Sequence, residues 1–216
     1  MQKPIIDRDG TQELLDARFV HVYRLTYTDG TRYIDASRRG TDNLVAFMDD
    51  EQLDALLPDA VAAALVIAPL GSDPKIVLFR EYRYPTGQYL LSVPSGLIDA
   101  KDKDATEPLV EAMVREVKEE CGITLVDGDT CKVINPLLYT SPGLTDESCA
   151  LLEVVVRSEA SDALSSAGTE GTERISDFSL FTKEEAKEIL DAGRDPWGAR
   201  FPLTTWAALM HFVYAM

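Results

Sequence analysis

The sequence predicts an α+β fold, an α/β/α sandwich in which a mixed β-sheet lies between helices and a small N-terminal β-hairpin region comes first. Apolar runs at residues 60–69 and 75–82 flank a turn at residues 70–74, as buried central strands do. Residues 105–121 repeat apolar side chains at three- and four-residue spacing, which is typical of an amphipathic helix. No internal repeat or heptad array competes with this interpretation.

The N-terminal region is expected to be a small β subdomain at residues 1–57, which is also a candidate dimerisation region. Residues 19–37 predict a β-hairpin, because two alternating segments rich in Val, Tyr and Ile flank Asp29-Gly30. Residues 44–48 are expected to form a further short strand, and residues 50–57 one or two helical turns. Residues 58–216 would then form the main domain.

In the main domain, residues 88–93 predict a short strand that ends at Pro94-Ser95-Gly96, a turn that we expect no strand to contain. The helix at residues 105–121 would be capped by Asp104 or Thr106. Three later strands and two helices complete the pattern, at residues 132–139, 149–156, 174–181, 183–192 and 203–214. The Ser-, Gly- and Thr-rich residues 158–172 predict a mobile loop between the last two strands.

Composition narrows the class of partner. The net charge is −16 and the sequence pI is about 4.5, so the chain would repel nucleic acid and polyphosphates alike unless metal ions or arginines supply local positive charge. The N-terminus has no apolar signal core, and the longest apolar run is too short to cross a membrane. Three cysteines without zinc-ligand spacing fit reduced thiols. We therefore expect a cytoplasmic protein that binds neither nucleic acid nor membrane.

Carboxylates on the predicted helix form the main candidate site. Glu116, Glu119 and Glu120 are three and four residues apart, so they converge on one helical face although like charges there repel. Such a cluster suits hard divalent cations such as Mg²⁺ or Mn²⁺. Arg115 could reach Glu119 and also Glu107, and so hold a carboxylate in place. A solvated acidic face is the alternative for a bare cluster of this kind.

The spacing around this cluster resembles the signature of the Nudix hydrolases, G-x5-E-x7-R-E-U-x-E-E-x-G-U, where U is apolar. From Glu107 to Ile123 every fixed position matches. One departure precedes the helix: ten residues, not five, separate Gly96 from Glu107, so we infer a five-residue insertion around Lys101. We expect this insertion to change a loop tip more than the metal ligands.

Outside the signature, the chain resembles the ADP-ribose pyrophosphatase branch of the family. The segments that carry this resemblance are Phe79–Pro85, Val93–Asp99 and Ser141–Glu147. The resemblance implies the Nudix fold, a homodimer, and hydrolysis of a nucleoside-diphosphate sugar such as ADP-ribose to AMP and ribose 5-phosphate.

The resemblance also implies roles for individual residues. Glu116, Glu119 and Glu120 would hold Mg²⁺ or Mn²⁺ together with the Ser95 backbone carbonyl, and Glu119, Glu120 and Arg115 would belong to the catalytic machinery. Arg83 would bind the diphosphate, because a guanidinium fork suits phosphate oxygens. Arg39 and Glu147 are further candidates for substrate binding, with a solvated edge as the alternative for Arg38 and Arg39, and a metal-ligand or base role, or a mere turn position, as alternatives for Glu147.

Some roles stay open between residues. A water-activating base would lie on the late loop, where Glu173 is the first candidate and Glu170 the second, although a solvated loop glutamate is equally consistent. Tyr33 and Tyr27 are candidates for stacking on the adenine base, with hairpin packing as the alternative. Two other functions compete with the main one: Nudix hydrolysis of a different nucleoside diphosphate derivative, and a module that senses nucleotides without cleaving them. Intact metal-binding glutamates argue against the sensor.

Overall fold

The chain folds into two compact units. The computed structural model describes residues 3–158, 164–168 and 174–216. The N-terminal unit consists of Met1–Asp59 together with Leu137–Cys149, and the sheet unit consists of Ala60–Pro136 and Ala150–Met216. The N-terminal unit is therefore built from two separate stretches of sequence.

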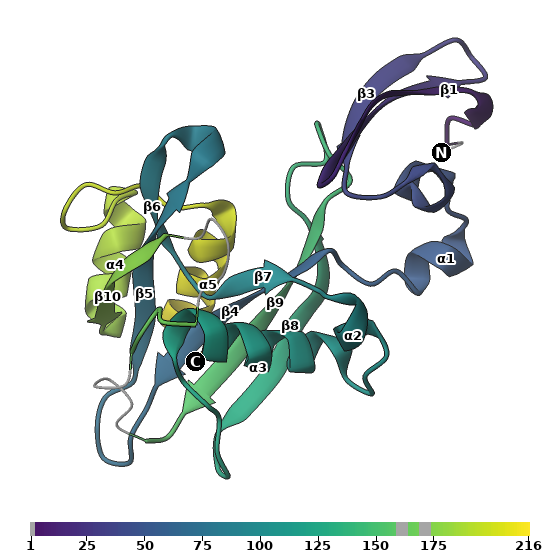
Figure 1. Ribbon diagram of the computed structural model, residues 1–216. Helices are drawn as coiled ribbons and strands as arrows, with labels where there is room; N and C mark the ends of the chain where they lie inside the picture. The colour runs from purple at the N-terminus through teal and green to yellow at the C-terminus, as the bar shows by residue number, and fades with distance from the viewer. Residues whose placement is uncertain (1–2, 159–163, 169–173) are drawn as a thin grey trace. The chain divides into compact units, whose positions relative to one another are not determined.

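A seven-stranded sheet forms the centre of the sheet unit (Figure 1). Five strands follow the order β10-β5-β4-β9-β8, while β6 pairs with β5 and β7 pairs with β4. The strands are β4 (Ala60–Ile67), β5 (Lys75–Arg83), β6 (Gln88–Ser92), β7 (Ser95–Leu97), β8 (Thr130–Tyr139), β9 (Ser148–Val156) and β10 (Ile175–Phe181). The start of β5 pairs with β4. Farther along the chain, β5 pairs with β6, while the first residues of β4 pair with β7, so β4 and β5 separate at this end of the sheet.

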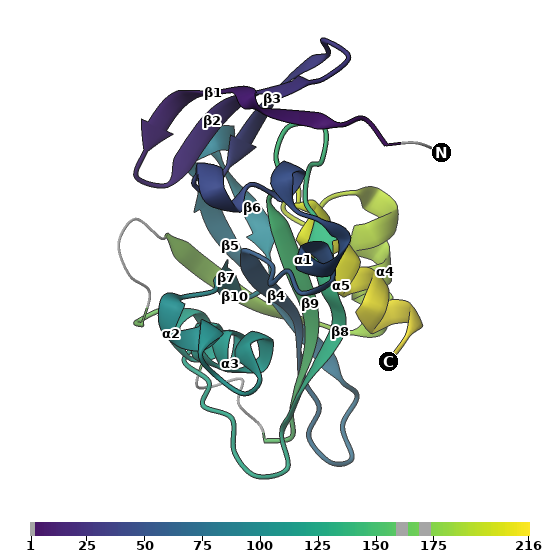
Figure 2. The ribbon, with the colours of Figure 1, turned by 90° about the vertical axis from the view of Figure 1, so that its right-hand side faces the viewer.

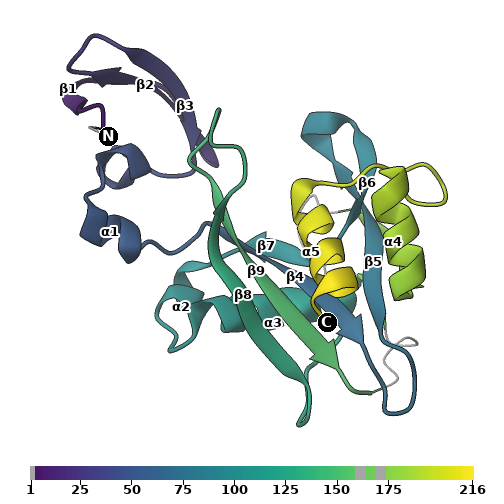
Figure 3. The ribbon, with the colours of Figure 1, turned by 180° about the vertical axis from the view of Figure 1, so that it is seen from behind.

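Helices cover both faces of this sheet. Alternate residues of β4, such as Val61, Ala63 and Leu65, share a buried cluster with Met113 and Val117 of the helix α3 (Pro108–Cys121). The β4 residues between them are also fully buried, so the strand is covered on both sides. Figures 1 and 3, seen from opposite sides, show α3 on one face and the helices α4 (Lys183–Ala192) and α5 (Leu203–Tyr214) on the other. The predicted α+β class, with a mixed sheet between helices, is confirmed.

The N-terminal unit is a three-stranded antiparallel sheet with a small core of its own. Its strands β1 (Ile6–Ala17), β2 (Val20–Tyr27) and β3 (Arg32–Ser37) lie side by side in that order (Figure 2). The buried side chains are Tyr23, Leu25, Leu44 and Phe47. Two short 3₁₀ helices, η1 (Thr41–Asn43) and η2 (Val45–Phe47), and the helix α1 (Asp50–Asp54) follow the sheet.

One prediction for the N-terminal unit was wrong, and one of its strands was not predicted. Residues 44–48 do not form a strand: η2 places Leu44 and Phe47 three residues apart, which buries both in the core of the unit. The predicted hairpin is present, but β1 adds a third strand that we did not expect, because its sequence is polar and contains Gly10. The pairing of β1 with β2 shifts register between Asp7 and Gln12 and again between Glu13 and Leu15, which accommodates this irregular pattern.

Two predictions for the sheet unit were also wrong. The predicted turn at Pro94-Ser95-Gly96 is in part a strand: Ser95-Gly96-Leu97 is β7, which pairs with β4. Pro94, which has no backbone N–H to donate, lies just before this strand. The main helix begins at Pro108 instead of residue 105. A proline disfavours helical backbone at the preceding residue, and Glu107 accordingly has φ −129° and ψ 72°. Among the helices that the structure describes, none is long and apolar enough to span a membrane.

Candidate functional site

The helix α3 presents the three carboxylates of the predicted site. Glu116 and Glu120 are buried, with 6% and 2% of their surface exposed, whereas the Glu119 side chain is 39% exposed. Buried carboxylates are costly unless hydrogen bonds or cations stabilise their charge. The apolar side of α3 packs on the sheet, so the cluster stands at the edge of the core with one member open to solvent.

Arg115 connects these carboxylates to the strand β7 and to the insertion that precedes α3. Its Nη1 donates to Glu116 Oε1 at 2.6 Å and to Glu119 Oε2 at 3.0 Å, and its Nη2 donates to the Leu97 carbonyl at 3.0 Å. Charge-assisted bonds from a planar guanidinium fix direction as well as distance. Arg115 therefore sets the orientation of two of the three candidate metal ligands.

The strand β7 fits closely against the same carboxylates. The Ser95 N–H donates to Glu120 Oε2 at 2.8 Å. A Cβ atom at position 96 would lie 2.0 Å from Glu116 Cδ, so only glycine leaves room for that side chain. Ser95 is thus part of the site through its N–H, while the metal-ligand role of its carbonyl stays a prediction.

The insertion is not a loop tip, contrary to our expectation. It forms the short helix α2 (Ala100–Lys103), and Asp102 of this helix is 5% exposed and accepts a 2.9 Å hydrogen bond from Arg115 Nη2. Asp102 is thus the fourth hydrogen-bond partner of Arg115, whereas Glu107, which we considered to be within its reach, is not among these partners. Burial raises the pKa of Asp102, but the hydrogen bonds from Arg115 and from the Asp99 N–H together outweigh burial, so the pKa is lowered. Sequence reasoning missed Asp102 because the contact depends on how the insertion folds.

A pocket of about 550 Å³ borders the cluster along α3. Its lining includes Arg115, Glu119 and Gly168. Gly168 lies so close to α3 that a Cβ there would be 2.8 Å from the Glu119 carbonyl oxygen. Gly168, in the described residues 164–168, therefore contacts the helix beside the carboxylates. The predicted base candidates on that loop, Glu173 and Glu170, lie outside the described residues.

Arg83 lies at the end of β5, on the strand face that continues from the core. Side chains two residues apart share a face, and Phe79 on that face belongs to the cluster packed against α3. Arg83 Nη2 pairs with Glu81 Oε2 at 2.7 Å; the Glu81 side chain is 8% exposed and that of Arg83 is 42% exposed. A buried carboxylate thus anchors a guanidinium that is still open to solvent, as an anion contact requires.

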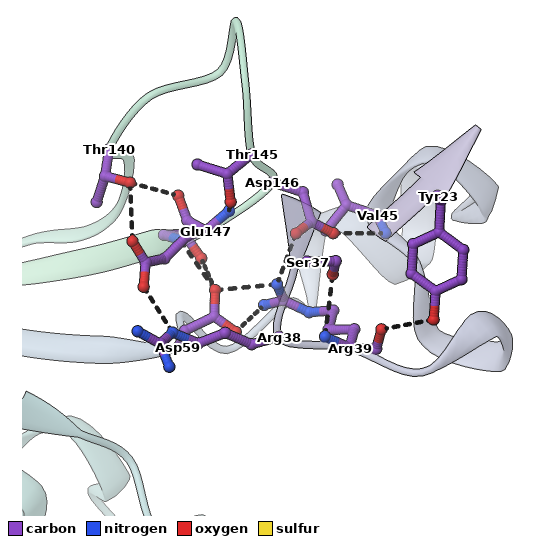
Figure 4. Close-up of polar contacts among 11 residues, drawn as sticks. Tyr23, Ser37, Arg38, Arg39, Val45, Asp59, Thr140, Thr145, Asp146 and Glu147 are labelled. Carbon is purple, nitrogen blue, oxygen red and sulfur yellow. Dashed lines mark hydrogen bonds and ion pairs between the residues drawn. The ribbon is translucent and has the colours of Figure 1, made fainter. Parts of the chain in front are cut away.

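The remaining candidates for substrate binding lie in the N-terminal unit (Figure 4). Arg39 forms a two-pronged ion pair with Asp59, with both N···O distances 2.9 Å, and Asp146 lies 3.8 Å away. Arg38 Nε donates to Glu147 Oε1 at 2.6 Å. With 11% of its side chain exposed, Arg39 is not part of a solvated edge pair. The substrate-binding roles of Arg39 and Glu147 stay predictions.

The N-terminal unit has two further features of chemical interest. Tyr27 and Tyr33 both line a pocket of about 590 Å³, whose other walls include Phe47 and Lys3. On the sheet, Glu13, Asp16 and His21 place ligand atoms within 4.8 Å of one another, and no other group in the part of the chain that the structure describes does so. Sequence reasoning missed this cluster because cross-strand pairing of Asp16 with His21 brings it together.

The donor set on α3 fits a divalent cation of the Mg²⁺ type. It offers carboxylate oxygens only, which are the ligands that such hard cations prefer. The glycine at position 96 leaves space beside Glu116 that a side chain would fill. Glu116, Glu119 and Glu120 would hold the ion, and Arg115 and the Ser95 N–H would orient them.

The chain is similar to known proteins over most of its length. A family model described as "NUDIX domain" matches residues 58–201. An uncharacterized Nudix hydrolase of Schizosaccharomyces pombe is 23% identical over 97% of this chain and 94% of its own length. A Caenorhabditis elegans protein named "Putative nudix hydrolase 2" is 42% identical over 39% of this chain and 34% of its own length.

The fold has a solved counterpart. A crystal structure titled "ADP compounds hydrolase" is similar with a TM-score of 0.54 and 20% identity, covering 91% of this chain and 85% of the other. At that identity the likeness concerns the fold. Together with the family model, which matches most of the chain, and the glutamate cluster on α3, it leads to one conclusion. The chain belongs to the Nudix family.

Proposed function

We propose that this chain hydrolyses the diphosphate bond of a nucleoside-diphosphate sugar, with Mg²⁺ or Mn²⁺ bound at α3. ADP-ribose, cleaved to AMP and ribose 5-phosphate, is the substrate we propose first. The observation that supports the proposal most directly is the arrangement around Arg115, which orients Glu116 and Glu119 while the Ser95 N–H orients Glu120. This is an organised set of oxygen donors, unlike a freely solvated acidic face.

Each side chain has a distinct task in the proposed reaction. Glu116, Glu119 and Glu120 would hold the cations, which when bound would neutralise the diphosphate and activate water. Arg83 donates charge-assisted hydrogen bonds to the diphosphate oxygens. The water oxygen bonds to one phosphorus atom as the bridging P–O bond breaks. The departing phosphate takes up that electron pair, and the proton that the water loses passes to solvent or to the departing phosphate. Arg115 keeps the carboxylates in place throughout.

Two considerations favour a nucleotide sugar as substrate. The segments around Arg83 and residues 141–147 resemble the ADP-ribose pyrophosphatase branch, and a protein of the same fold is titled "ADP compounds hydrolase". These likenesses select ADP-ribose as the first substrate to test, ahead of other diphosphate derivatives.

The test compares wild-type protein with the double variant Glu119→Gln/Glu120→Gln on ADP-ribose in the presence of Mg²⁺ or Mn²⁺. We expect wild type to release AMP, and the double variant to lose at least a hundredfold in kcat because a neutral amide binds these cations weakly. Chromatographic detection of AMP measures the rate, and circular dichroism with a thermal melt checks that the fold is kept.

The matched control is Glu188→Gln, which removes an exposed carboxylate from α4, on the opposite face of the sheet. It should leave the rate unchanged. Robust turnover by the double variant would refute the metal-ligand assignment. Release of a phosphate monoester from other diphosphates but not from ADP-ribose would instead refute the substrate.

A further inference from the structure

The residues between Gly96 and Glu107 bring a buried carboxylate to the guanidinium that orients the candidate metal ligands. Asp102 lies in α2, the short helix formed by the insertion, and its exposed fraction is 5%. Its Oδ2 atom accepts two hydrogen bonds, from the Asp99 N–H at 2.9 Å and from Arg115 Nη2 at 2.9 Å. The first bond fixes Asp102 within α2, and the second ties α2 to α3.

The two ends of the Arg115 guanidinium have different partners. Nη2 faces the insertion and β7, where it donates to Asp102 and to the Leu97 carbonyl. Nη1 faces the cluster, where it donates to Glu116 and Glu119. Because the guanidinium is planar and rigid, an anchor at one end fixes the direction of the other.

Charge gives Asp102 a role that the glutamates cannot take. The Arg115 side chain is only 17% exposed, so its charge needs a permanent anionic partner. A divalent cation would compete with Arg115 for Glu116 and Glu119, whereas Asp102 would remain paired with it. Without that carboxylate, Nη2 would keep only the exposed and more distant Asp99, 3.8 Å away, as an anionic partner, so Arg115 would bind the glutamates more strongly and oppose the cation.

We propose that Asp102 is a positioning residue, which holds Arg115 so that Glu116 and Glu119 can bind a divalent cation. This inference rests on the proposed function for the cation site. The inserted segment, which interrupts the spacing of the Nudix signature, would thus help to orient the metal ligands. Asp102 itself touches neither substrate nor metal, and acts only through Arg115.

The test is Mn²⁺ affinity, measured by electron paramagnetic resonance of the free ion on the full-length protein. Asp102→Asn keeps an oxygen for the Asp99 N–H but removes the charge facing Arg115. We expect its Kd for Mn²⁺ to rise about tenfold or more, the range typical for loss of a residue that orients a metal ligand. Asp104→Asn, an exposed position two residues later, is the matched control and should leave Kd unchanged.

Two further measurements keep the outcome decisive. Glu119→Gln/Glu120→Gln reports Mn²⁺ bound elsewhere, for instance at Glu13, Asp16 and His21, and this background is subtracted. If Asp102→Asn does not fold, Asp102→Glu and Asp104→Glu replace the pair, and only the change at 102 should weaken binding.

The two proposals fail differently. A Kd for Asp102→Asn within twofold of wild type would overturn the positioning role alone. If wild type bound no more Mn²⁺ than Glu119→Gln/Glu120→Gln, the cation site of the proposed function would fail as well.

Discussion

At position 96, any side chain would occupy the space of the Glu116 carboxyl group. The backbone there belongs to β7, and a Cβ atom would lie 2.0 to 2.4 Å from three atoms of that group. The atoms in the way are the end of a movable side chain, not backbone. Replacement should therefore displace Glu116 more than it disturbs the strand.

We expect Gly96→Ala to lower the affinity for Mn²⁺ at least tenfold, because Glu116 must leave the position that Arg115 gives it. Calorimetric titration measures the affinity. Gly40→Ala is the control, because a Cβ there meets nothing within 4 Å. Equal Mn²⁺ affinities for Gly96→Ala and wild type would show that Glu116 can bind from another position.

Single residues differ in how far the sequence reveals them. Glu116, Glu119, Glu120 and Arg115 could be identified because their spacing on one helix determines which of them are neighbours. Asp102 could not, since its contact with Arg115 depends on the path of the insertion. Local spacing thus indicated that Arg115 and the three glutamates are neighbours on α3, but not that Asp102 holds Arg115.

At the scale of elements, an ion pair holds the α4–α5 connection against β5. Asp195 is fully buried at its side chain; its Oδ2 accepts from Arg80 at 2.9 Å and its Oδ1 from the N–H groups of Trp197 and Ala199 at 2.9 and 2.7 Å. Arg80 in turn lies 5.0 Å from the centre of the Trp197 ring. The same connection supports β6, because the Leu91 N–H donates to the Arg200 carbonyl.

We expect Asp195→Ala to reduce the free energy of unfolding by about 3 to 5 kcal/mol, since two N–H groups lose their acceptor and the partly buried Arg80 keeps only the exposed Asp177, 3.7 Å away, as an anionic partner. Urea denaturation followed by tryptophan fluorescence measures this, because Trp197 lies in the connection itself. Asp191→Asn, which changes an exposed partner of Lys187 in α4, should have little effect. A similar loss in both variants would contradict the role of the buried pair.

The sequence predicts elements best where their boundaries are encoded locally. Both bounds of α4 follow from Thr182 and Gly193: the Thr182 hydroxyl caps its first turn and Gly193 takes the left-handed conformation after it. By contrast, β1 and β7 were not predicted. Their sequences are polar or too short, and each becomes a strand by pairing with a neighbour, β2 or β4.

At the scale of the whole molecule, the N-terminal unit contains a buried acid that responds to pH. Burial, and then the charge of Asp146, raise the pKa of Asp35 to about 6, despite the opposing effects of the Asp146 N–H and Arg39. In the unfolded chain the pKa is near the ordinary value of 3.8. Between these two values the folded state keeps a proton that the unfolded state releases, so stability falls as pH rises from about 4 to 6.

We expect Asp35→Asn to equal wild type in stability near pH 4 and to exceed it by about 3 kcal/mol at pH 7.5, because the amide has no charge to desolvate. Hydrogen–deuterium exchange of β2 and β3 amides at several pH values measures this locally. Asp9→Asn, an exposed change on β1, should show no such divergence. A constant difference across pH would mean that Asp35 ionises normally.

The overall class was predictable because apolar runs and periodicity determine how many faces each element must bury. The composition of the two units was not, since nothing local indicates that Leu137–Cys149 joins the first 59 residues. A homodimer and a cytoplasmic location stay predictions from the sequence.

Because the N-terminal unit is built from two stretches of sequence, cleavage between them should not separate them. The Ala36 N–H donates to Leu144, the Tyr33 hydroxyl to Gly143, and Arg38 to Glu147, so residues from both stretches share one hydrogen-bonded framework. A protease nick after Asp59 would break the covalent link and leave these non-covalent bonds in place. The N-terminal peptide would therefore stay bound to residues 137–149 after cleavage. A truncated protein that begins at residue 60 would instead expose the surface of residues 137–149 that this peptide covers.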